Sequence, residues 1–238
     1  MKTALVTGAS RGIGRAVAIR LAREGFAVGL IARSTDALNA LAQEISDHGG
    51  TALPISCDIS QPKEVASMFD SLREKWTRLD LVFNNAGQNI EGTLEPSLPE
   101  IRAVYEVNVF GVYSVLQHAV PWLKSQRGGT IINISSISGI TGFPGAGAYC
   151  SSKFALRGLN ESLHNELEPL GVRVCAIAPS WVDTDMAEHC PFPAEKRIAP
   201  EDIADAVLYI TKLGENVSIK EVVIGCRSDL GEVENSEL

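Results

Sequence analysis

The sequence lacks the long apolar runs, paired cysteines and clustered histidines that mark membrane, secreted and metal-binding proteins. No apolar run approaches the roughly 18 residues that span a bilayer, and the start, MKTALVTGAS, has neither the apolar core nor the cleavage site of a signal peptide. The five cysteines form no C-x-x-C motif, which favours reduced thiols and a cytoplasmic location. The four histidines show no metal-ligand spacing, so we expect no metal site.

Basic charge is also scarce. Lys and Arg number 21 against 29 Asp and Glu, and the net charge of −8 disfavours binding to nucleic acid. Apolar residues make up 45% of the 238 residues and charged residues 21%, which is typical of a globular chain with a full core. We expect one domain over residues 1–228, a frayed acidic tail over residues 229–238, and no membrane partner.

Short β-rich segments alternate with longer helical patterns along the whole chain. The expected strands cover residues 3–7, 26–32, 51–56, 79–84, 129–135, 172–179 and 220–225. The expected helices cover residues 13–24, 36–46, 63–76, 97–125, 147–168 and 200–213. Strands with few polar residues, each followed by an amphipathic helix, predict an α/β fold with one doubly wound parallel sheet of about seven strands. Such a sheet binds ligands at the carboxyl ends of its strands.

The segment TGASRGIG (residues 7–14) follows the first strand and opens a helix. Gly8 permits a tight turn, Gly12 lets the backbone approach a phosphate, and Gly14 allows close packing of the helix on the strand. The free amides at the helix N-terminus then favour an anion. The same stretch also reads as G-x-S-x-G, the nucleophile elbow of hydrolases, with Ser10 as nucleophile. Only seven residues precede Gly8, too few for the upstream strands and oxyanion loop of that fold.

The end of the second strand indicates which dinucleotide binds. An acidic residue there would bind a ribose diol, but the sequence reads LIARS, with Ala32 followed by Arg33. Arg11 adds a second guanidinium in the glycine loop. Because arginine binds phosphate oxygens in a bidentate manner, these residues favour the 2′-phosphate of NADP(H).

Seven motifs in order carry a resemblance to the short-chain dehydrogenase/reductase family, in particular to its NADP-preferring, Rossmann-like members. The motifs are TGASRGIG, CDI (57–59), NNAG (84–87), Asn108 in VNVFG, NISS (133–136), YCSSK (149–153) and APS (178–180). Together they extend from Thr3 to about Gly225. The resemblance implies a single Rossmann-like domain with strand order 3-2-1-4-5-6-7.

The resemblance also implies a catalytic set of Asn108, Ser136, Tyr149 and Lys153. Tyr149 and Lys153 lie four residues apart, on one face of a helix. We expect the ammonium to lower the pKa of the phenol, making Tyr149 a general acid for carbonyl reduction and a base for the reverse. Ser136 would hydrogen-bond the substrate oxygen. Asn108 matches the family's helix-breaking asparagine, which would hold a water in a proton relay through the lysine.

The expected cofactor contacts follow from the same motifs. Asp58 and Ile59 match residues that contact adenine, and Thr184 matches the residue that bonds the nicotinamide carboxamide. Ser180 stands where the family usually has glycine, which puts that contact in doubt. The full set is Gly8, Ser10, Arg11, Gly12, Ile13, Gly14, Arg33, Asp58, Ile59, Asn85, Ala86, Gly87, Tyr149, Lys153, Pro179, Ser180, Val182 and Thr184.

The substrate region departs further from the family. Fifteen residues separate Thr184 from the next helix, so the lid over the substrate is expected to be short. An apolar wall from Phe143, Trp181, Met186 and Phe192, with polar contacts from Gln88 and Asn89, would suit a partly apolar carbonyl compound. The segment SIKEVVIGC replaces the usual end of the sheet. Family members commonly pair through the helices near 97–125 and 147–168, which implies a homodimer or homotetramer.

Four functions stay open at this point. The leading one is NADPH-dependent interconversion of a small-molecule carbonyl and an alcohol. Reduction of a 3-oxoacyl thioester on an acidic carrier protein is the second, and it would require a basic patch; the candidates are Arg102, Arg127, Arg157 and Arg173. An NADP(H)-sensing regulatory protein needs no proton donor, and a methyltransferase would lack the Tyr–Lys pair.

Overall fold

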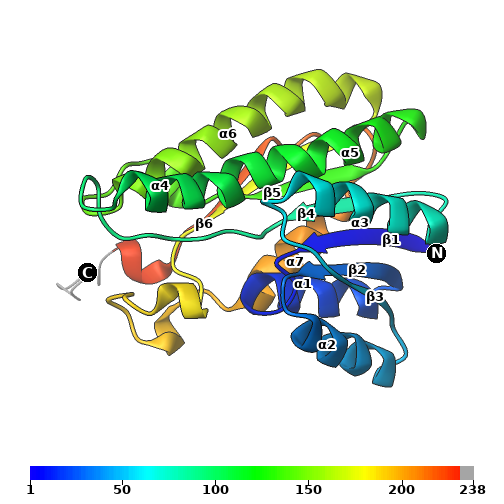
Figure 1. Ribbon diagram of the computed structural model, residues 1–238, viewed down its shortest axis with the longest axis horizontal. Coiled ribbons are helices and arrows are strands. Elements are labelled where there is room, and N and C mark those ends of the chain that lie inside the picture. Colours follow the sequence, from blue (N-terminus) through cyan, green and yellow to red (C-terminus); the bar gives the residue numbers. More distant parts are fainter. Residues whose placement is uncertain (231–238) are drawn as a thin grey trace, which may run out of the picture.

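The computed structural model describes residues 1–230 and shows one seven-stranded parallel sheet between two layers of helices (Figure 1). The strands are β1 (Lys2–Thr7), β2 (Phe26–Ala32), β3 (Thr51–Ser56), β4 (Leu81–Asn84), β5 (Thr130–Ile134), β6 (Arg173–Pro179) and β7 (Glu221–Ile224). Their order is β3-β2-β1-β4-β5-β6-β7, which confirms the predicted fold class and strand order.

The sequence explains which strands lie inside the sheet. Every residue of β5, and every residue of β1 after Lys2, is buried, because helices cover both faces. Strand β3 pairs with β2 alone and is partly exposed. This edge position accommodates Pro54, which has no backbone N–H to donate to a further strand.

The helices divide between the two faces of the sheet. They are α1 (Gly12–Arg23), α2 (Thr35–Asp47), α3 (Pro62–Lys75), α4 (Leu98–Tyr105), α5 (Val112–Ser125), α6 (Gly147–Leu167) and α7 (Pro200–Thr211). One apolar cluster joins α1, α2 and α7 to the sheet, and a second joins α3, α5 and α6 (Figure 1). Among residues 1–230, no helix is long and apolar enough to cross a bilayer, and no group of side chains is arranged to hold a metal ion.

The helix predicted over residues 97–125 is interrupted. It starts at a capping box, in which Ser97 N donates to Glu100 Oε2 at 2.8 Å, and ends as α4 at Tyr105. A π-helical segment, Glu106–Gly111, then leads into α5. A Cβ on Gly111 would lie 2.8 Å from Ile59 Cγ1, so this segment packs closely on the loop after β3.

The chain after β7 ends in a short 3₁₀ helix, Arg227–Leu230, so the first two residues of the predicted tail belong to this turn. The other residues of that tail, 231–238, lie outside the described residues.

Candidate active site

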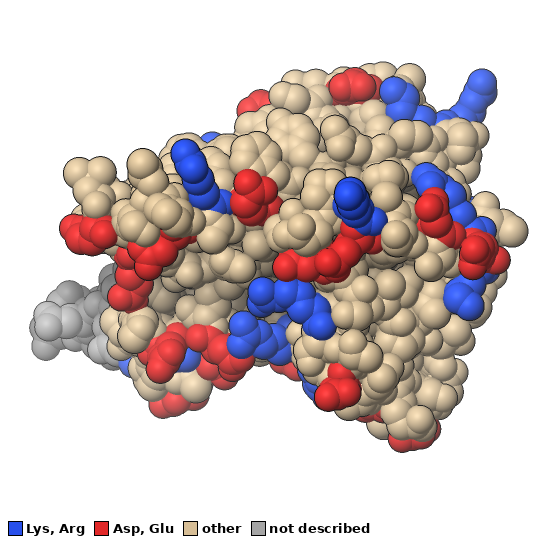
Figure 2. Space-filling model, in the orientation of Figure 1, with Lys and Arg blue, Asp and Glu red and all other residues tan. Residues whose placement is uncertain are grey.

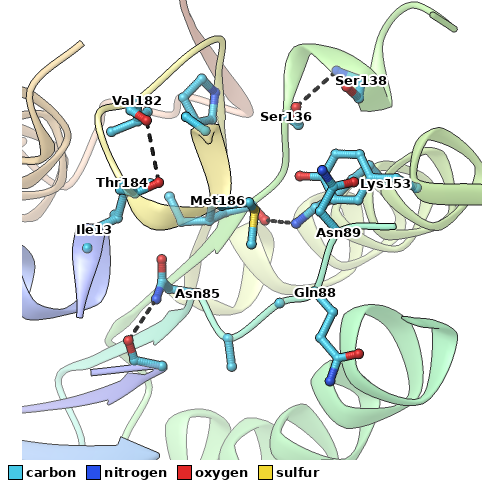
Figure 3. Close-up of a pocket in the computed structure, with 18 of the residues that line it drawn as sticks. Ile13, Asn85, Gln88, Asn89, Ser136, Ser138, Lys153, Val182, Thr184 and Met186 are labelled. Carbon is cyan, nitrogen blue, oxygen red and sulfur yellow. Dashed lines mark hydrogen bonds between the residues drawn. The ribbon is translucent and has the colours of Figure 1, made fainter. Parts of the chain in front are cut away.

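A cavity of about 1460 Å³ opens at the carboxyl ends of the strands. It is larger than the roughly 300–1000 Å³ of most small-molecule pockets, so a dinucleotide and a second molecule fit together. Of the predicted catalytic and cofactor-binding residues, only Gly14 and Asn108 do not line it. In Figure 3, Val182 and Thr184 from the segment after β6 face Ser136 and Lys153 across the cavity. The topology has therefore brought predicted residues from the ends of six strands, β1 to β6, to one place.

The glycine loop has the geometry that a phosphate cradle needs. Gly8 and Gly12 adopt φ angles of +66° and +53°, which side chains other than glycine rarely adopt. A Cβ on Gly14 would lie 2.2 Å from the carbonyl oxygen of Gly8, so α1 packs against the loop with no room for a methyl group. Gly14 thus acts by packing, as predicted. The residues present fit the diphosphate of a dinucleotide at the N-terminus of α1.

Asn85 holds this loop in place. Its Nδ2 donates to the carbonyl oxygens of Thr7 at 3.0 Å and Gly8 at 3.2 Å. Thr7 Oγ1 in turn accepts from the backbone N–H groups of Asn85 and Ala86, at 3.0 and 3.1 Å. Asn85 therefore lines the cavity while its side chain supports the turn after β1.

The two predicted phosphate-binding arginines have different surroundings. Arg33 is exposed, lines the cavity after β2 and precedes Ser34, the N-cap of α2. Arg11 pairs instead with Asp185 across the cavity, with 2.7 Å between Nη1 and Oδ2. Both partners of that ion pair are more than 70% exposed, so its strength falls with salt. Arg33 is the better placed of the two for a 2′-phosphate.

Asp58 and Ile59 follow β3 at the edge of the cavity. Asp58 Oδ1 accepts from the backbone N–H and the hydroxyl of Ser60, at 3.0 and 2.8 Å, which fixes the turn before α3. Ile59 is buried, packs against Gly111 and lines the cavity. The Asp58 carboxylate is thus used mainly within its own loop.

Tyr149, Lys153 and Ser136 converge in the half of the cavity that lies over β5, β6 and β7, named here the substrate end. Tyr149 and Lys153 share one face of α6, and Lys153 Nζ lies 5.6 Å from the centre of the Tyr149 ring. Ser136 caps the turn after β5, accepting from Ser138 N at 3.1 Å, and its hydroxyl hydrogen-bonds Tyr149. Lys153 is 4% exposed and donates to the carbonyl oxygen of Ile134 at 3.0 Å.

The predicted direction of the tyrosine pKa is wrong for the protein without cofactor. Burial raises the pKa of Tyr149 to about 12, and its hydrogen bond with Ser136 only partly opposes this. Burial also lowers the pKa of Lys153 from 10.5 to about 8. Both shifts share one cause, because removal from water disfavours the charged form of each group. The phenol is therefore a firmly protonated donor.

Asn108 lies in the π-helical segment and is 1% exposed. Its Nδ2 donates to the carbonyl oxygen of Gln88 at 2.9 Å and to Ser152 Oγ at 3.0 Å, while its Oδ1 accepts from Gln88 N at 2.8 Å. The side chain thus ties the loop after β4 to α6. These three bonds engage both the amide nitrogen and the oxygen of the Asn108 side chain, which positions the neighbouring loop.

The substrate end has a largely apolar wall. Phe143, Trp181 and Met186 line it as expected, together with Gln88 and Asn89. Phe192 does not line it; this side chain packs against the core cluster of α1, α2 and α7. The sequence interpretation missed further lining residues: Ile90, Glu91, Ile137, Ile140, Asp185, His189, Val223 and Asp229.

Two side-chain contacts join the segment after β6 to the rest of the cavity rim, one an ion pair and one between a histidine and a carboxylate. Arg11–Asp185 reaches the glycine loop, and His189 Nε2 lies 3.5 Å from Glu91 Oε1 in the loop after β4. The sequence carried no signal for either pair, because the partners lie far apart in the chain.

Comparisons with known proteins agree with this arrangement. The family described as short chain dehydrogenase matches residues 2–191. A protein named as an uncharacterized oxidoreductase of Staphylococcus epidermidis is 34% identical over 224 residues, covering 94% of this chain and 96% of that protein. A 3-oxoacyl-[acyl-carrier-protein] reductase of Synechocystis sp. is 33% identical over 218 residues, covering 88% of each.

A solved structure extends the likeness to three dimensions. The alcohol dehydrogenase of the archaeon Thermococcus sibiricus, complexed with 5-hydroxy-NADP, is 35% identical and matches with a TM-score of 0.87, over 94% of this chain and 96% of that chain. Sequence, strand order and the residues around the cavity agree, and the chain belongs to the short-chain dehydrogenase/reductase family.

Proposed function

We propose that this protein is an NADP(H)-dependent oxidoreductase that interconverts a carbonyl compound and the corresponding alcohol. The observation that carries the proposal is the convergence of Tyr149, Lys153 and Ser136 at one wall of a cavity that also contains the glycine loop. A protein that only sensed the cofactor would have no use for a proton donor in the same cavity.

The residues of the cavity support NADP(H) as the cofactor. The glycine loop fits a diphosphate, and Arg33 is exposed at the end of β2, where a 2′-phosphate would be bound. The bound 5-hydroxy-NADP of the Thermococcus sibiricus enzyme supports the same assignment. When bound, the nicotinamide supplies a hydride to a carbonyl carbon or accepts one from an alcohol.

The chain's own residues handle the proton and the developing charge. With its pKa at about 12, Tyr149 keeps its proton until a carbonyl oxygen gains negative charge, and then donates it. Ser136, hydrogen-bonded to that phenol, is placed to stabilise the same oxygen. The Lys153 ammonium beside the ring stabilises the tyrosinate that forms. In the reverse direction, Tyr149 takes the proton from the alcohol.

Reduction of 3-oxoacyl thioesters is a second candidate, favoured by the likeness to the Synechocystis reductase. It requires basic groups free to meet an acidic carrier protein. Two of the four candidate arginines are already engaged: Arg157 forms a bidentate pair with Glu221, at 2.8 and 3.0 Å, and Arg173 donates to carbonyl oxygens after α7. The surface therefore favours a small-molecule substrate.

The proposed function is tested by following the loss of NADPH absorbance with a panel of ketones, aldehydes, diketones and 3-oxoacyl thioesters. The wild type is expected to reduce members of the small-carbonyl group, and Tyr149→Phe to lose about 10²- to 10⁴-fold in kcat. Tyr209→Phe is the matched control, because Tyr209 is exposed on α7 and does not line the cavity. Near-full turnover by Tyr149→Phe would refute the assignment.

We also propose that the protein is a homo-oligomer. Phe110 and Phe154 are 54% and 44% exposed, and Tyr113 is 44% exposed, on the adjoining π-helical segment, α5 and α6. Exposed aromatic side chains gathered on one helical layer favour association with a second copy. The five free cysteines agree with the expected reducing compartment.

A further inference from the structure

Two places where the sequence departs from the family pattern meet at the substrate end. Ser180, in place of the usual glycine, donates a short hydrogen bond from its hydroxyl to Asp229 Oδ2. The Ser180 hydroxyl oxygen in turn accepts from Trp181 N at 2.5 Å. Asp229 belongs to the 3₁₀ helix Arg227–Leu230, beyond the altered end of the sheet. Glycine at position 180 would have no hydroxyl to make this link.

Further contacts fix the same segment as a wall of the cavity. Cys226, 3% exposed, donates from Sγ to the carbonyl oxygen of Lys196 at 2.8 Å, and Asp229 N donates to Cys226 O at 3.0 Å. Ser180 N also donates to Ile224 O at 2.9 Å. Figure 1 shows the red C-terminal turn beside the yellow and orange segment after β6. The turn that carries Asp229 is therefore fixed at the cavity, and the exposed Asp229 carboxylate is oriented there by its hydrogen bond with Ser180.

The fixed charges at the substrate end are predominantly negative. Asp229 lines it from one side, and Glu91, paired with His189, lines it from the loop after β4. The basic side chains that reach this part of the cavity already have partners: Lys153 donates to Ile134 O, and Arg11 pairs with Asp185. In Figure 2, red acidic side chains gather on this face over the segment after β6 and near α4.

We infer, on the basis of the proposed function, that Asp229 is a specificity-determining residue positioned by Ser180. It restricts the substrate to neutral or cationic carbonyl compounds with an apolar body. A carboxylate or phosphate on the substrate meets a like charge that Ser180 orients at the wall of the cavity, and this repulsion disfavours anionic substrates. The apolar body lies against Ile137, Phe143, Trp181 and Val223.

A pair of ketones that differ in one charge tests this inference. Methyl para-acetylbenzoate is neutral, and para-acetylbenzoate carries a carboxylate. Each is measured as a substrate with NADPH and, by titration calorimetry, as a ligand, for the wild type and for Asp229→Asn, Ser180→Gly and Glu74→Gln. Asparagine at position 229 keeps an oxygen that accepts from Ser180 but removes the charge. Glu74→Gln removes an exposed charge on α3, away from the cavity.

We expect the wild type to prefer the ester, and Asp229→Asn to lower this ester-to-acid ratio by about three- to tenfold. Ser180→Gly, which releases the carboxylate, lowers the ratio in the same direction, and Glu74→Gln leaves it unchanged. Melting temperatures near that of the wild type show that the variants are folded. An unchanged ratio in Asp229→Asn, or a wild type that prefers the acid, overturns the inference.

The two proposals can fail separately. If no carbonyl compound is reduced, the proposed function is refuted, while the calorimetric ratio still decides whether Asp229 excludes anions from the cavity. If carbonyl compounds are reduced and the ratio does not depend on Asp229, this inference alone is overturned.

Discussion

Lys153 is expected to destabilise the folded protein, although the proposed catalysis requires it. Its ammonium is 4% exposed, and burial lowers its pKa from 10.5 to about 8. A depression of this size corresponds to about 3 kcal/mol of unfavourable free energy for the charged form in the folded protein. That cost is present near neutral pH, where the ammonium is charged in both the folded and unfolded chains.

The variant Lys153→Met should therefore be more stable than the wild type near neutral pH, without bound cofactor. Methionine has a similar length and no charge. It cannot donate the hydrogen bond that Lys153 donates to Ile134 O, and this bond contributes about 1 kcal/mol. The net gain is about 2 kcal/mol, or a rise of about 4–8 °C in melting temperature for a chain of this size. Lys75→Met, an exposed position on α3, is the matched control and should show little change.

The pH dependence gives a second, independent signature. Because the folded pKa of Lys153 lies below its unfolded value, the unfolded chain binds more protons between these two pKa values, and wild-type stability rises with pH there. By about pH 9.5 the free energy of unfolding of the wild type should have risen by about 2 kcal/mol relative to that of Lys153→Met. Measurements should stop below about pH 10, where Tyr149 begins to lose its proton in the unfolded chain. Because the pKa of Tyr149 is raised in the folded protein, its titration lowers the free energy of unfolding as the pH rises further.

Urea unfolding of both proteins at about pH 7 and about pH 9.5 measures the gap. A Lys153→Met variant less stable than the wild type at about pH 7, or a gap that does not shrink with pH, would refute the reasoning. Comparing the two proteins at each pH removes the contribution of every titrating group that they share.

Three further predictions concern the cofactor, the glycine loop and assembly. Arg33→Ala should raise the KM for NADPH by about tenfold or more and leave the KM for NADH nearly unchanged, and equal effects on both cofactors would contradict the assigned role. Gly14→Ala should lower the free energy of unfolding by about 1–3 kcal/mol and weaken NADPH binding measured by fluorescence, because its methyl group meets Gly8 O. The control Gly158→Ala, with open space around its Cβ on α6, should stabilise by about 0.5–1 kcal/mol. Phe154→Glu should lower the mass measured by light scattering, and a monomeric wild type would contradict the proposed assembly.

The arrangement of strands and helices could be predicted because its signals are local. Each strand is a short apolar run, each is followed by a helix, and β-α-β connections are nearly always right-handed, so the parallel sheet followed from the pattern. The interruption of the helix near residues 106–111 was indicated only by the resemblance, in which Asn108 matches a helix-breaking asparagine. Its apolar periodicity is continuous, and the π-helical turn depends on contacts of Gly111 with Ile59 and of Asn108 with Gln88.

The residues of the candidate site could also be predicted from the sequence, whereas the direction of the Tyr149 pKa shift could not. Motifs at strand ends placed Ser136 and Tyr149 at one cavity because parallel strands share one carboxyl edge. The pKa of Tyr149, however, depends on how completely its neighbours exclude water. The sequence shows that a lysine is near but not how far each group is removed from water, so it predicted a lowered pKa where desolvation raises it.

The contacts that close the cavity depend on pairings between distant segments. Arg11 meets Asp185 from 174 positions away, and Ser180 meets Asp229 from 49 positions away. No periodicity links such positions, and each partner alone reads as an ordinary surface residue. Ser180 nevertheless stood out as a departure from the family, and the structure gives the departure a physical meaning. Serine at position 180 lacks the backbone freedom of glycine but has a hydroxyl, and this hydroxyl orients Asp229 at the substrate end. Departures from a family motif are therefore the positions at which to look for what one member binds and its relatives do not.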